Sequence, residues 1–222
     1  GCSVLYHLTK LGWSDVMLIE RSELTSGSTW HAAGGFHTLN GDTNMAALQG
    51  YTIRLYKELE AITGMSCGLH HVGGITLADN KERFDQLKAE RAKHRYMGLD
   101  TEILGPEEIR KFTSGMVNLE GIVGALYDPL DGHLDPSGTT HAYAKAARMG
   151  GAEIVLHNRV LETNPTAEGW EVVTEKGTVY CEHLVNAGGL WAREIGAMAG
   201  VYLPLLPMAH QYLVTDDIPE IM

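Results

Sequence analysis

The sequence predicts an α/β fold built around a Rossmann-type dinucleotide-binding unit, and three observations lead to this prediction. Gly1 is followed by an apolar segment of helical character over residues 2–8. Residues 15–20 then form an apolar run that ends in an acid, as a buried parallel strand does. Residues 182–191 have the character of a strand that runs into a second turn of small residues and a helix. Two such units in one chain are typical of a dinucleotide-binding fold.

The composition fits a globular protein and argues against several partners. With 222 residues and 44% hydrophobic content, the chain is long enough to bury a substantial core. The net charge is -11 and the basic residues are scattered, so we expect neither nucleic acid nor a membrane surface as a partner. The three cysteines form no C-x-x-C pair, which favours a reducing compartment. No run approaches the roughly 18 apolar residues that a membrane span requires.

The first unit begins inside a phosphate-binding motif. We expect Gly1 to be the last glycine of a G-x-G-x-x-G turn, with the first strand and the other two glycines preceding the sequence given. A glycine there lets the helix pack closely, and the helix N-terminus faces the pyrophosphate. Gly12 marks the predicted helix end. Glu20, at the end of the next strand, is placed to accept hydrogen bonds from the adenosine ribose, or else is a solvated carboxylate.

The middle of the sequence predicts alternating helices and strands. Leu48, Leu55 and Leu59 are spaced as on a core-facing helix, and Gly64 follows its last turn. Proline and glycine mark the ends of the other elements. The predictions are a helix over 45–63, a strand over 73–78, a charged surface helix over 81–96, a helix starting at 106 and a strand over 121–127.

Residues 135–180 predict one helix and a group of strands. Asp135 and Pro136 supply an N-cap and a first-turn proline for a helix that ends at Met149. We interpret Asp128 and Asp135 as turn and cap residues and not as a catalytic carboxylate pair. Strands are predicted over 152–156 and 159–163, and a hairpin over 170–174 and 178–180 that turns at 176–177.

A histidine among small residues is the most informative feature of the sequence. His31 lies in the run GSTWHAAGG over residues 27–35. A neutral imidazole is a good nucleophile, and the small residues after it let the backbone approach a flat ring closely. The alternative is a surface-loop histidine followed by a glycine-rich turn.

The motif Ser-Thr-Trp-His-Ala-Ala-Gly over residues 28–34 resembles the dimethylglycine and sarcosine dehydrogenase family, and the likeness covers nearly the whole chain. The resemblance implies FAD, held covalently through the flavin 8α-methyl carbon by His31. It also implies a D-amino-acid-oxidase-like architecture, in which a FAD-binding domain is interleaved with an α+β substrate domain. The expected division is FAD-binding over 1–45 and 132–202, substrate-binding over 46–131, and a return into the substrate domain from 203–222.

The resemblance also assigns site residues. The expected cofactor-binding residues are Gly1, Glu20, Ser28, Thr29, His31, Ala33, Gly34, Val160, Ala187, Gly188, Gly189 and Trp191. For Val160 the implied role is a backbone contact near the adenine, and the alternative is a core valine. For residues 187–189 the alternative is a tight strand-to-helix turn without a ligand.

A second histidine is the candidate catalytic residue. The segment PLLPMAHQY over residues 204–212 predicts a strand on which His210 and Tyr212 face the same side. The resemblance places His210 at the flavin in the substrate cavity, where it acts as a general base or holds the amine in its free form. A hydrogen-bonded core histidine is the alternative. The adjacent His70 and His71 point to opposite faces of a strand, so we predict no metal site.

The expected activity follows from these assignments. We expect oxidative N-demethylation of a small N-methylated amino acid, because STWHAAG and AHQY look more similar to the dimethylglycine branch than to the sarcosine branch. The acceptor is expected to be an electron-transfer flavoprotein or oxygen. The location is expected to be cytoplasmic in a bacterium or the mitochondrial matrix in a eukaryote. Two alternatives remain: a non-catalytic regulatory relative, and an amine or amino-acid oxidase that holds FAD without a covalent bond.

Overall fold

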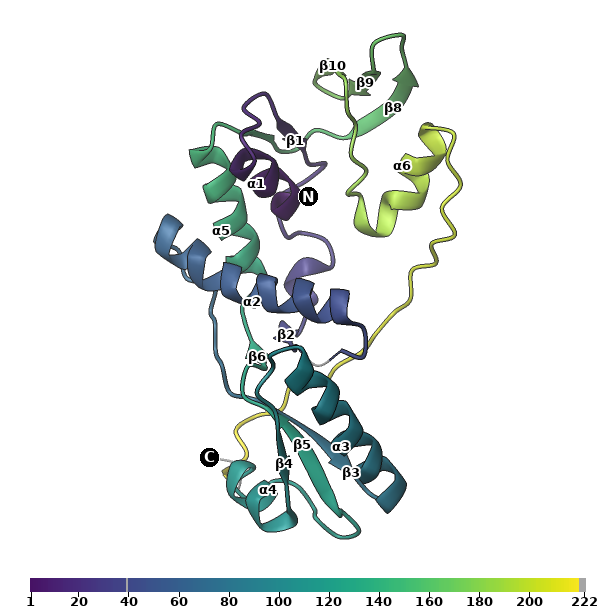
Figure 1. Cartoon of the computed structure of the whole chain (residues 1–222). Coiled ribbons are helices and arrows are strands. Elements are labelled where there is room, and N and C mark those ends of the chain that lie inside the picture. Colours follow the sequence, from purple (N-terminus) through teal and green to yellow (C-terminus); the bar gives the residue numbers. More distant parts are fainter. Residues whose placement is uncertain (39, 220–222) are drawn as a thin grey trace. The chain divides into compact units, whose positions relative to one another are not determined.

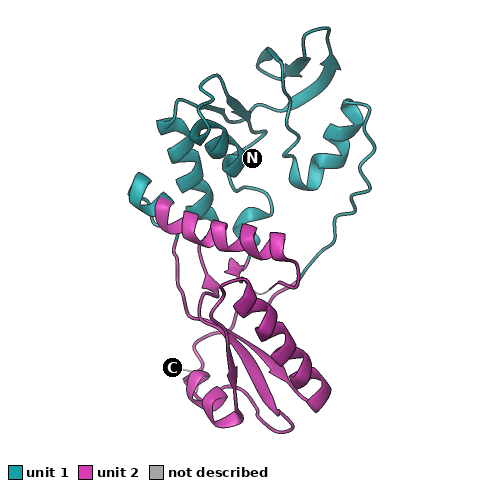
Figure 2. Cartoon of the chain, in the orientation of Figure 1, with its two compact units in different colours: residues 1–32, 59–67, 136–210 teal, residues 33–58, 68–135, 211–222 magenta. Residues whose placement is uncertain are grey.

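The computed structural model describes residues 1–38 and 40–219, and the chain forms two compact units (Figure 2). Unit 1 comprises residues 1–32, 59–67 and 136–210. Unit 2 comprises residues 33–58, 68–135 and 211–222. The long helix α2 (Thr43–Thr63) contributes its first part to unit 2 and its last turn to unit 1. The chain therefore passes several times between the two units.

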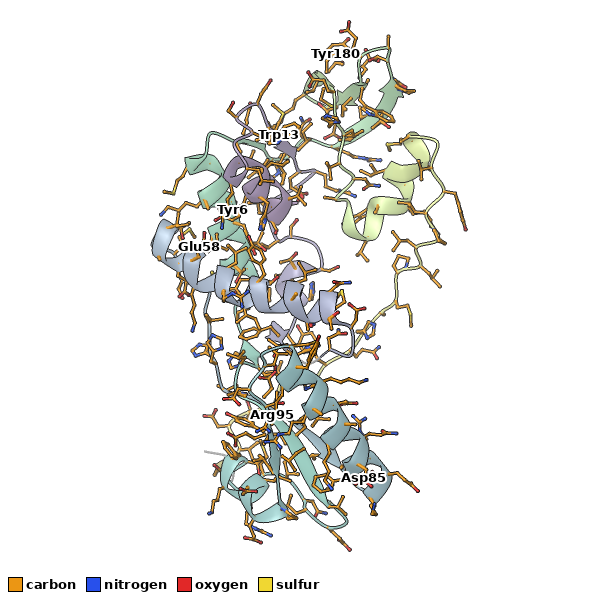
Figure 3. The ribbon with its side chains drawn as sticks, viewed as in Figure 1. Tyr6, Trp13, Glu58, Asp85, Arg95 and Tyr180 are labelled. Atoms are coloured by element: carbon orange, nitrogen blue, oxygen red, sulfur yellow. The ribbon has the colours of Figure 1, made fainter. Side chains whose placement is uncertain are left out.

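Unit 1 contains a parallel strand pair beside two packed helices (Figure 1). Strand β1 (Met17–Ile19) pairs in parallel with β7 (Glu153–Val155). Helix α1 (Cys2–Lys10) packs against α5 (Pro136–Met149), and the ring centroids of Tyr6 and Tyr143 lie 5.7 Å apart (Figure 3). The alanine-rich face of α5 is buried, which permits this close approach. Both helices begin and end within two residues of the predicted bounds.

The rest of unit 1 is a small antiparallel sheet and a helix. The sheet has the order β10-β9-β8, and its strands are β8 (Val160–Pro165), β9 (Trp170–Thr174) and β10 (Gly177–Cys181). Because Thr174 pairs with Gly177, the hairpin turns at residues 175–176, one position before the predicted turn. A short 3-10 helix, η2 (Gly189–Trp191), leads into α6 (Ala192–Met198).

Unit 2 has a three-stranded antiparallel sheet with a helix on each face. The sheet order is β3-β5-β4, formed by β3 (Gly74–Ala78), β5 (Gly124–Asp128) and β4 (Glu102–Leu104). Leu126 packs with Leu87 of α3 (Lys81–Tyr96), whereas its neighbour Ala125 packs with Ile109 of α4 (Pro106–Phe112). Successive residues of a strand face opposite sides, so these two contacts place the two helices on opposite faces.

A second small ladder in unit 2 joins distant parts of the sequence. Strand β2 (Gly35–Phe36) pairs with β6 (Gly132–His133), and His70 adds a bridge to His133 with N···O distances of 2.8 and 3.0 Å. The rings of His70 and His133 stack at 5.0 Å, while His71 packs edge-on against Phe36 at 5.5 Å. The two adjacent histidines thus have different partners, as their alternation predicts.

Two predicted strands are wrong. Residues 183–188 and 201–218 have no regular secondary structure, so the strand expected after residue 182 and the strand expected around His210 are both absent. A strand needs a hydrogen-bonded neighbour, and within the described ranges 1–38 and 40–219 neither segment pairs with another strand. No helix in the same ranges is long and apolar enough to cross a bilayer.

Candidate functional site

The N-terminus of α1 is the centre of the candidate site in unit 1. Gly1 occupies the N-cap position, and its carbonyl accepts the hydrogen bond of the Leu5 amide at 3.0 Å. A Cβ atom added to Gly1 would lie 3.1 Å from Leu18 Cδ1 and 3.9 Å from the Cβ of Ala187. Two predicted site residues from opposite ends of the sequence therefore meet beside β1. The absent side chain leaves the first helical amides accessible to an anion.

Glu20 follows β1 directly and lies on the same side as the start of α1. Its amide donates to the Val155 carbonyl at 2.9 Å, and its carboxylate accepts from the Ser22 amide at 2.9 Å. Burial raises the pKa of the Cys2 thiol, and the negative charge of Glu20 adds to that rise. The charge of Glu20 is therefore felt at Cys2, in the first turn of α1.

The second glycine turn is held by a residue that the sequence reasoning missed. The Asn186 side chain donates to the Ala192 carbonyl at 2.8 Å and accepts from the Gly188 amide at 3.1 Å. A Cβ atom on Gly188 would lie 3.2 Å from the Ala192 nitrogen, and Gly189 has φ +57°. An asparagine two residues before a glycine is a known turn signal, and it was available in the sequence.

His31 lies at the end of the 3-10 helix η1 (Thr29–His31), which also contains Thr29 and follows Ser28. Its side chain is exposed, and its ring centroid is 3.7 Å from that of Trp30. The Nδ1 atom lies 3.3 Å from the Gly27 carbonyl oxygen. A neutral imidazole that donates from Nδ1 to this carbonyl keeps its lone pair on Nε2. The histidine is thus exposed and has a free nucleophilic nitrogen in that tautomer.

The remaining predicted cofactor residues are distributed over both units. Trp191 lies in η2, and the guanidinium of Arg21 covers its ring at 4.7 Å from the centroid. Val160 begins β8 and pairs with Thr174. Ala33 and Gly34 belong to unit 2, where the Gly34 carbonyl accepts from the Leu134 amide at 3.0 Å.

His210 is exposed and extended, and Tyr212 beyond it is 62% exposed. In the part of the chain that the structure describes, no hydrogen bond joins His210 to another predicted site residue. Among the described residues, the structure brings Gly1 close to Ala187 of the second glycine turn, and no hydrogen bond links His210 to either.

Unit 2 contains an acid pair, formed by the buried Asp128 and the half-buried Asp131, that the sequence reasoning did not find. Asp128 is 1% exposed, accepts a hydrogen bond from the Thr38 hydroxyl, and accepts another from the Leu130 amide at 2.9 Å. Asp131 accepts from the Thr38 amide at 3.1 Å. Burial, followed by the charge of Asp128, raises the pKa of Asp131 to about 7. The bond to Leu130 confirms the predicted turn role of Asp128, whose acidic partner is Asp131.

The charge of Asp128 also affects the pKa of a buried imidazole, that of His94. His94 is 2% exposed and its Nδ1 atom has no hydrogen-bond partner. Burial lowers the pKa of His94, against the opposing effects of Glu90 and Asp128. Across residues 1–38 and 40–219, no group of three or more His, Cys, Asp or Glu side chains is arranged to hold a metal ion.

Comparisons with known proteins indicate the family of this chain. The family model described as FAD dependent oxidoreductase matches residues 1–222. Mitochondrial dimethylglycine dehydrogenase of Rattus norvegicus is 41% identical over 222 residues, which are 100% of this chain and 26% of that protein. Mitochondrial sarcosine dehydrogenase of Homo sapiens is 36% identical over 228 residues, covering 100% of this chain and 25% of that protein.

A solved structure shows the same fold. The crystal structure of L-proline dehydrogenase from P. horikoshii matches with a TM-score of 0.83 and 26% identity, over 90% of this chain and 53% of that chain. These similarities confirm the resemblance stated from the sequence and the predicted α/β, D-amino-acid-oxidase-like fold class. The chain spans about a quarter of the length of the curated relatives it matches.

Proposed function

The chain belongs to the FAD-dependent oxidoreductase family, and from this premise we propose that it takes part in oxidative N-demethylation of a small N-methylated amino acid. Dimethylglycine is the preferred substrate and sarcosine the second. The observation that carries the proposal is the meeting of Gly1 and Ala187 at the start of α1, with Glu20 beside it and an exposed His31 in the same unit. We assign FAD binding chiefly to unit 1 and substrate binding chiefly to unit 2.

The residues of unit 1 fit an adenine dinucleotide. The amides at the start of α1 and the turn over residues 187–189 are suited to the pyrophosphate, because glycine leaves the backbone accessible there. Glu20 is suited to the ribose hydroxyls. Ser28, Thr29, Ala33, Gly34, Val160 and Trp191 are assigned to the remaining contacts. FAD, when bound, supplies a two-electron acceptor at its N5 atom.

His31 is proposed to hold FAD covalently. Its ring is exposed, and Nδ1 lies in hydrogen-bond range of the Gly27 carbonyl. When Nδ1 donates to this carbonyl, the free lone pair of the imidazole is on Nε2. Nε2 is therefore the atom we propose to bond to the 8α-methyl carbon. Attachment fixes the position of the ring system relative to unit 1.

His210 is proposed to act on the substrate amine. Loss of a hydride from the N-methyl carbon requires the nitrogen lone pair, so the amine must be unprotonated when the two electrons leave. His210 either removes that proton or holds the free amine by a hydrogen bond. The oxidised carbon is an iminium, and water converts it to formaldehyde and the amine that is one methyl group shorter. An electron-transfer flavoprotein or oxygen is the proposed final acceptor.

Anaerobic stopped-flow spectroscopy of the full-length protein with FAD tests this function. We expect dimethylglycine and sarcosine to bleach the flavin absorbance, with dimethylglycine the faster. Trimethylglycine is the matched control, because its quaternary nitrogen has no lone pair and it must leave the flavin oxidised. Absence of bleaching by both substrates contradicts the proposed activity and favours the non-catalytic alternative.

A further inference from the structure

The indole of Trp191 lies against Arg21 and close to Gly27, two residues of the segment that precedes His31. Arg21 covers the indole ring, with its guanidinium carbon 4.7 Å from the ring centroid. A Cβ atom on Gly27 would lie 3.7 Å from Cζ3 and 3.9 Å from Cη2 of Trp191. All three residues belong to unit 1. We call residues 21–31 the linking segment.

The linking segment has an unusual backbone that needs support. Thr25 has φ +70°, a left-handed conformation that a β-branched residue rarely adopts. Leu24 is buried and anchors the middle of the segment, whereas Arg21, Ser28 and His31 are exposed. The segment is held by the His157 amide, which donates to the Ser22 carbonyl at 3.1 Å, and by Trp191, which lies against Arg21 and close to Gly27.

Gly27 connects the indole to the histidine. One face of this residue is in contact range of Trp191, and its carbonyl oxygen lies 3.3 Å from His31 Nδ1. A shift of Gly27 would change both the direction and the tautomer of the His31 ring. Trp191 is 42% exposed, and the guanidinium of Arg21 lies over its ring, a contact that favours this orientation of the indole.

We infer that Arg21 and Trp191 are positioning residues for the bond between His31 and the flavin. The cation–π pair restrains Gly27, and Gly27 restrains the imidazole with Nε2 in position to react. In the attachment step the Nε2–C bond forms while one C–H of the 8α-methyl group and one imidazole N–H break. The two protons and the electron pair would remain on the flavin, and dissolved oxygen, the acceptor in the assay, would reoxidise it. This inference rests on the proposed covalent attachment. Trp191 is already assigned a contact with the cofactor. The inference adds a second role for Trp191, which acts through Gly27. Its consequence is that the pair controls the rate of bond formation more than the affinity for FAD, because correct placement of the reacting atoms is a kinetic requirement.

The test measures the covalent step separately from FAD binding. Apoprotein of the full-length chain is mixed with FAD, binding is followed by flavin fluorescence, and samples taken over time are denatured and scored for fluorescent protein. Trp191→Ala is expected to slow covalent attachment by about tenfold or more, and Arg21→Met by about threefold, the loss typical of one exposed cation–π contact. FAD affinity is expected to change less than the rate does. Trp191→Phe should restore most of the rate, because it keeps an aromatic face for both contacts.

Two further variants make the result decisive. Trp13→Ala removes another exposed tryptophan of unit 1, which contacts His183 at 5.8 Å and not the linking segment, and it should react at the wild-type rate (Figure 3). Arg21→Met combined with Trp191→Ala should be no slower than Trp191→Ala alone, since the arginine acts through the indole. If Trp191→Ala does not fold, Arg21→Met and Trp191→Phe decide the question.

The possible results separate this inference from the proposed function. Wild-type protein that binds FAD but never becomes fluorescent after denaturation overturns the proposed covalent attachment, and the inference with it. Wild-type protein that becomes fluorescent, with Arg21→Met and Trp191→Ala attaching flavin at the same rate, overturns the inference alone. Equal losses of affinity and rate in both variants also overturn it, because they indicate an ordinary contact with the cofactor.

Discussion

The dinucleotide-facing residues of unit 1 and the acid pair of unit 2 differ in how their polar groups are satisfied. Gly1 at the start of α1, Ala187 and Gly189 in the second glycine turn, and His31 are exposed, whereas the Gly188 amide between them donates to the Asn186 side chain. Asp128 and Asp131 are instead bonded to Thr38 and to each other. Polar groups left available on a rigid scaffold are suited to a ligand, whereas internally paired groups contribute to the stability of the fold and to its pH dependence.

His210 should give the largest effect on the reaction itself. Replacement by Ala removes the proposed proton acceptor, and we expect flavin reduction by dimethylglycine to slow by about 100-fold or more. FAD content should stay at the wild-type level, because His210 has no hydrogen bond to the glycine turns in the described ranges. Stopped-flow rates and the flavin-to-protein ratio provide the two measurements. A rate within about threefold of wild type would mean that His210 lies outside the reacting site.

Gly188→Val tests whether FAD binding depends on the shape of the turn over residues 187–189. The new Cβ atom would lie 3.2 Å from both the Ala192 nitrogen and the Asn186 Oδ1 atom, so the turn has to move and the amides that we assign to the pyrophosphate move with it. We expect the Kd for FAD to rise by about tenfold to 100-fold, as for loss of one or two charge-assisted hydrogen bonds. Gly41→Ala is the control, because its Cβ would meet open space. Equal Kd values for both variants would separate this turn from the cofactor.

Asp131→Asn tests how the acid pair of Asp128 and Asp131 changes the stability of the fold with pH. The folded-state pKa of Asp131 is raised from 3.8 to about 7, so the folded protein binds this proton more tightly and loses stability as pH rises from 4 to 7. Asparagine cannot ionise, and above pH 7 the variant should be more stable than wild type by about 2 kcal/mol, a value reduced for partial exposure. Below pH 4 the two should be equal. Urea unfolding across this pH range gives the comparison.

Asp85→Asn is the control for that experiment. Asp85 lies on the exposed face of α3, and hydrogen bonds from Lys81 and Lys88 lower its pKa (Figure 3). The stabilising effect of Asp85 is therefore present above its unfolded pKa and is lost as pH falls, the opposite sign from Asp131. If Asp131→Asn were less stable than wild type above pH 7, the acid pair would not share a proton.

Asn186→Ala should have the smallest effect of the four. It removes two hydrogen bonds that hold the second glycine turn, at 2.8 and 3.1 Å, but both bonds are exposed to solvent. We expect the Kd for FAD to increase by about threefold to fivefold, with the fold intact. Equilibrium titration with FAD measures the Kd, and circular dichroism checks that the fold is intact. An effect larger than that of Gly188→Val would show that the asparagine side chain itself contacts the ligand.

The elements that the sequence predicted well are those whose signals are local. The helix over 81–96 has its observed bounds because Gly98, which has φ +77°, follows it as predicted. The structure adds a cap at its start, where Asn80 accepts from the Arg83 amide at 2.7 Å. The helix after Asp135 begins at the proline that favours a first turn. Gly1, Glu20 and the second glycine turn could be proposed as cofactor residues from the sequence because their motif repeats a known backbone geometry.

The features that were missed depend on distant contacts. Asp131 acquires its raised pKa from Asp128 and from burial near Thr38, which lies far away in the sequence, so no short motif could reveal the pair. The strands expected over 182–187 and around His210 failed because apolar character cannot show whether a neighbouring strand is available. Trp191 was assigned to the cofactor, but its contacts with Arg21 and Gly27 required the tertiary structure.

The most direct test of the account is mass spectrometry of proteolytic peptides from the full-length protein purified with FAD. The account predicts that the peptide containing His31 carries the flavin mass and that fragmentation places it on the imidazole. His31→Ala should bind FAD yet release all of it on denaturation. Complete release of flavin from the wild-type protein, with an unmodified His31 peptide, would contradict the account.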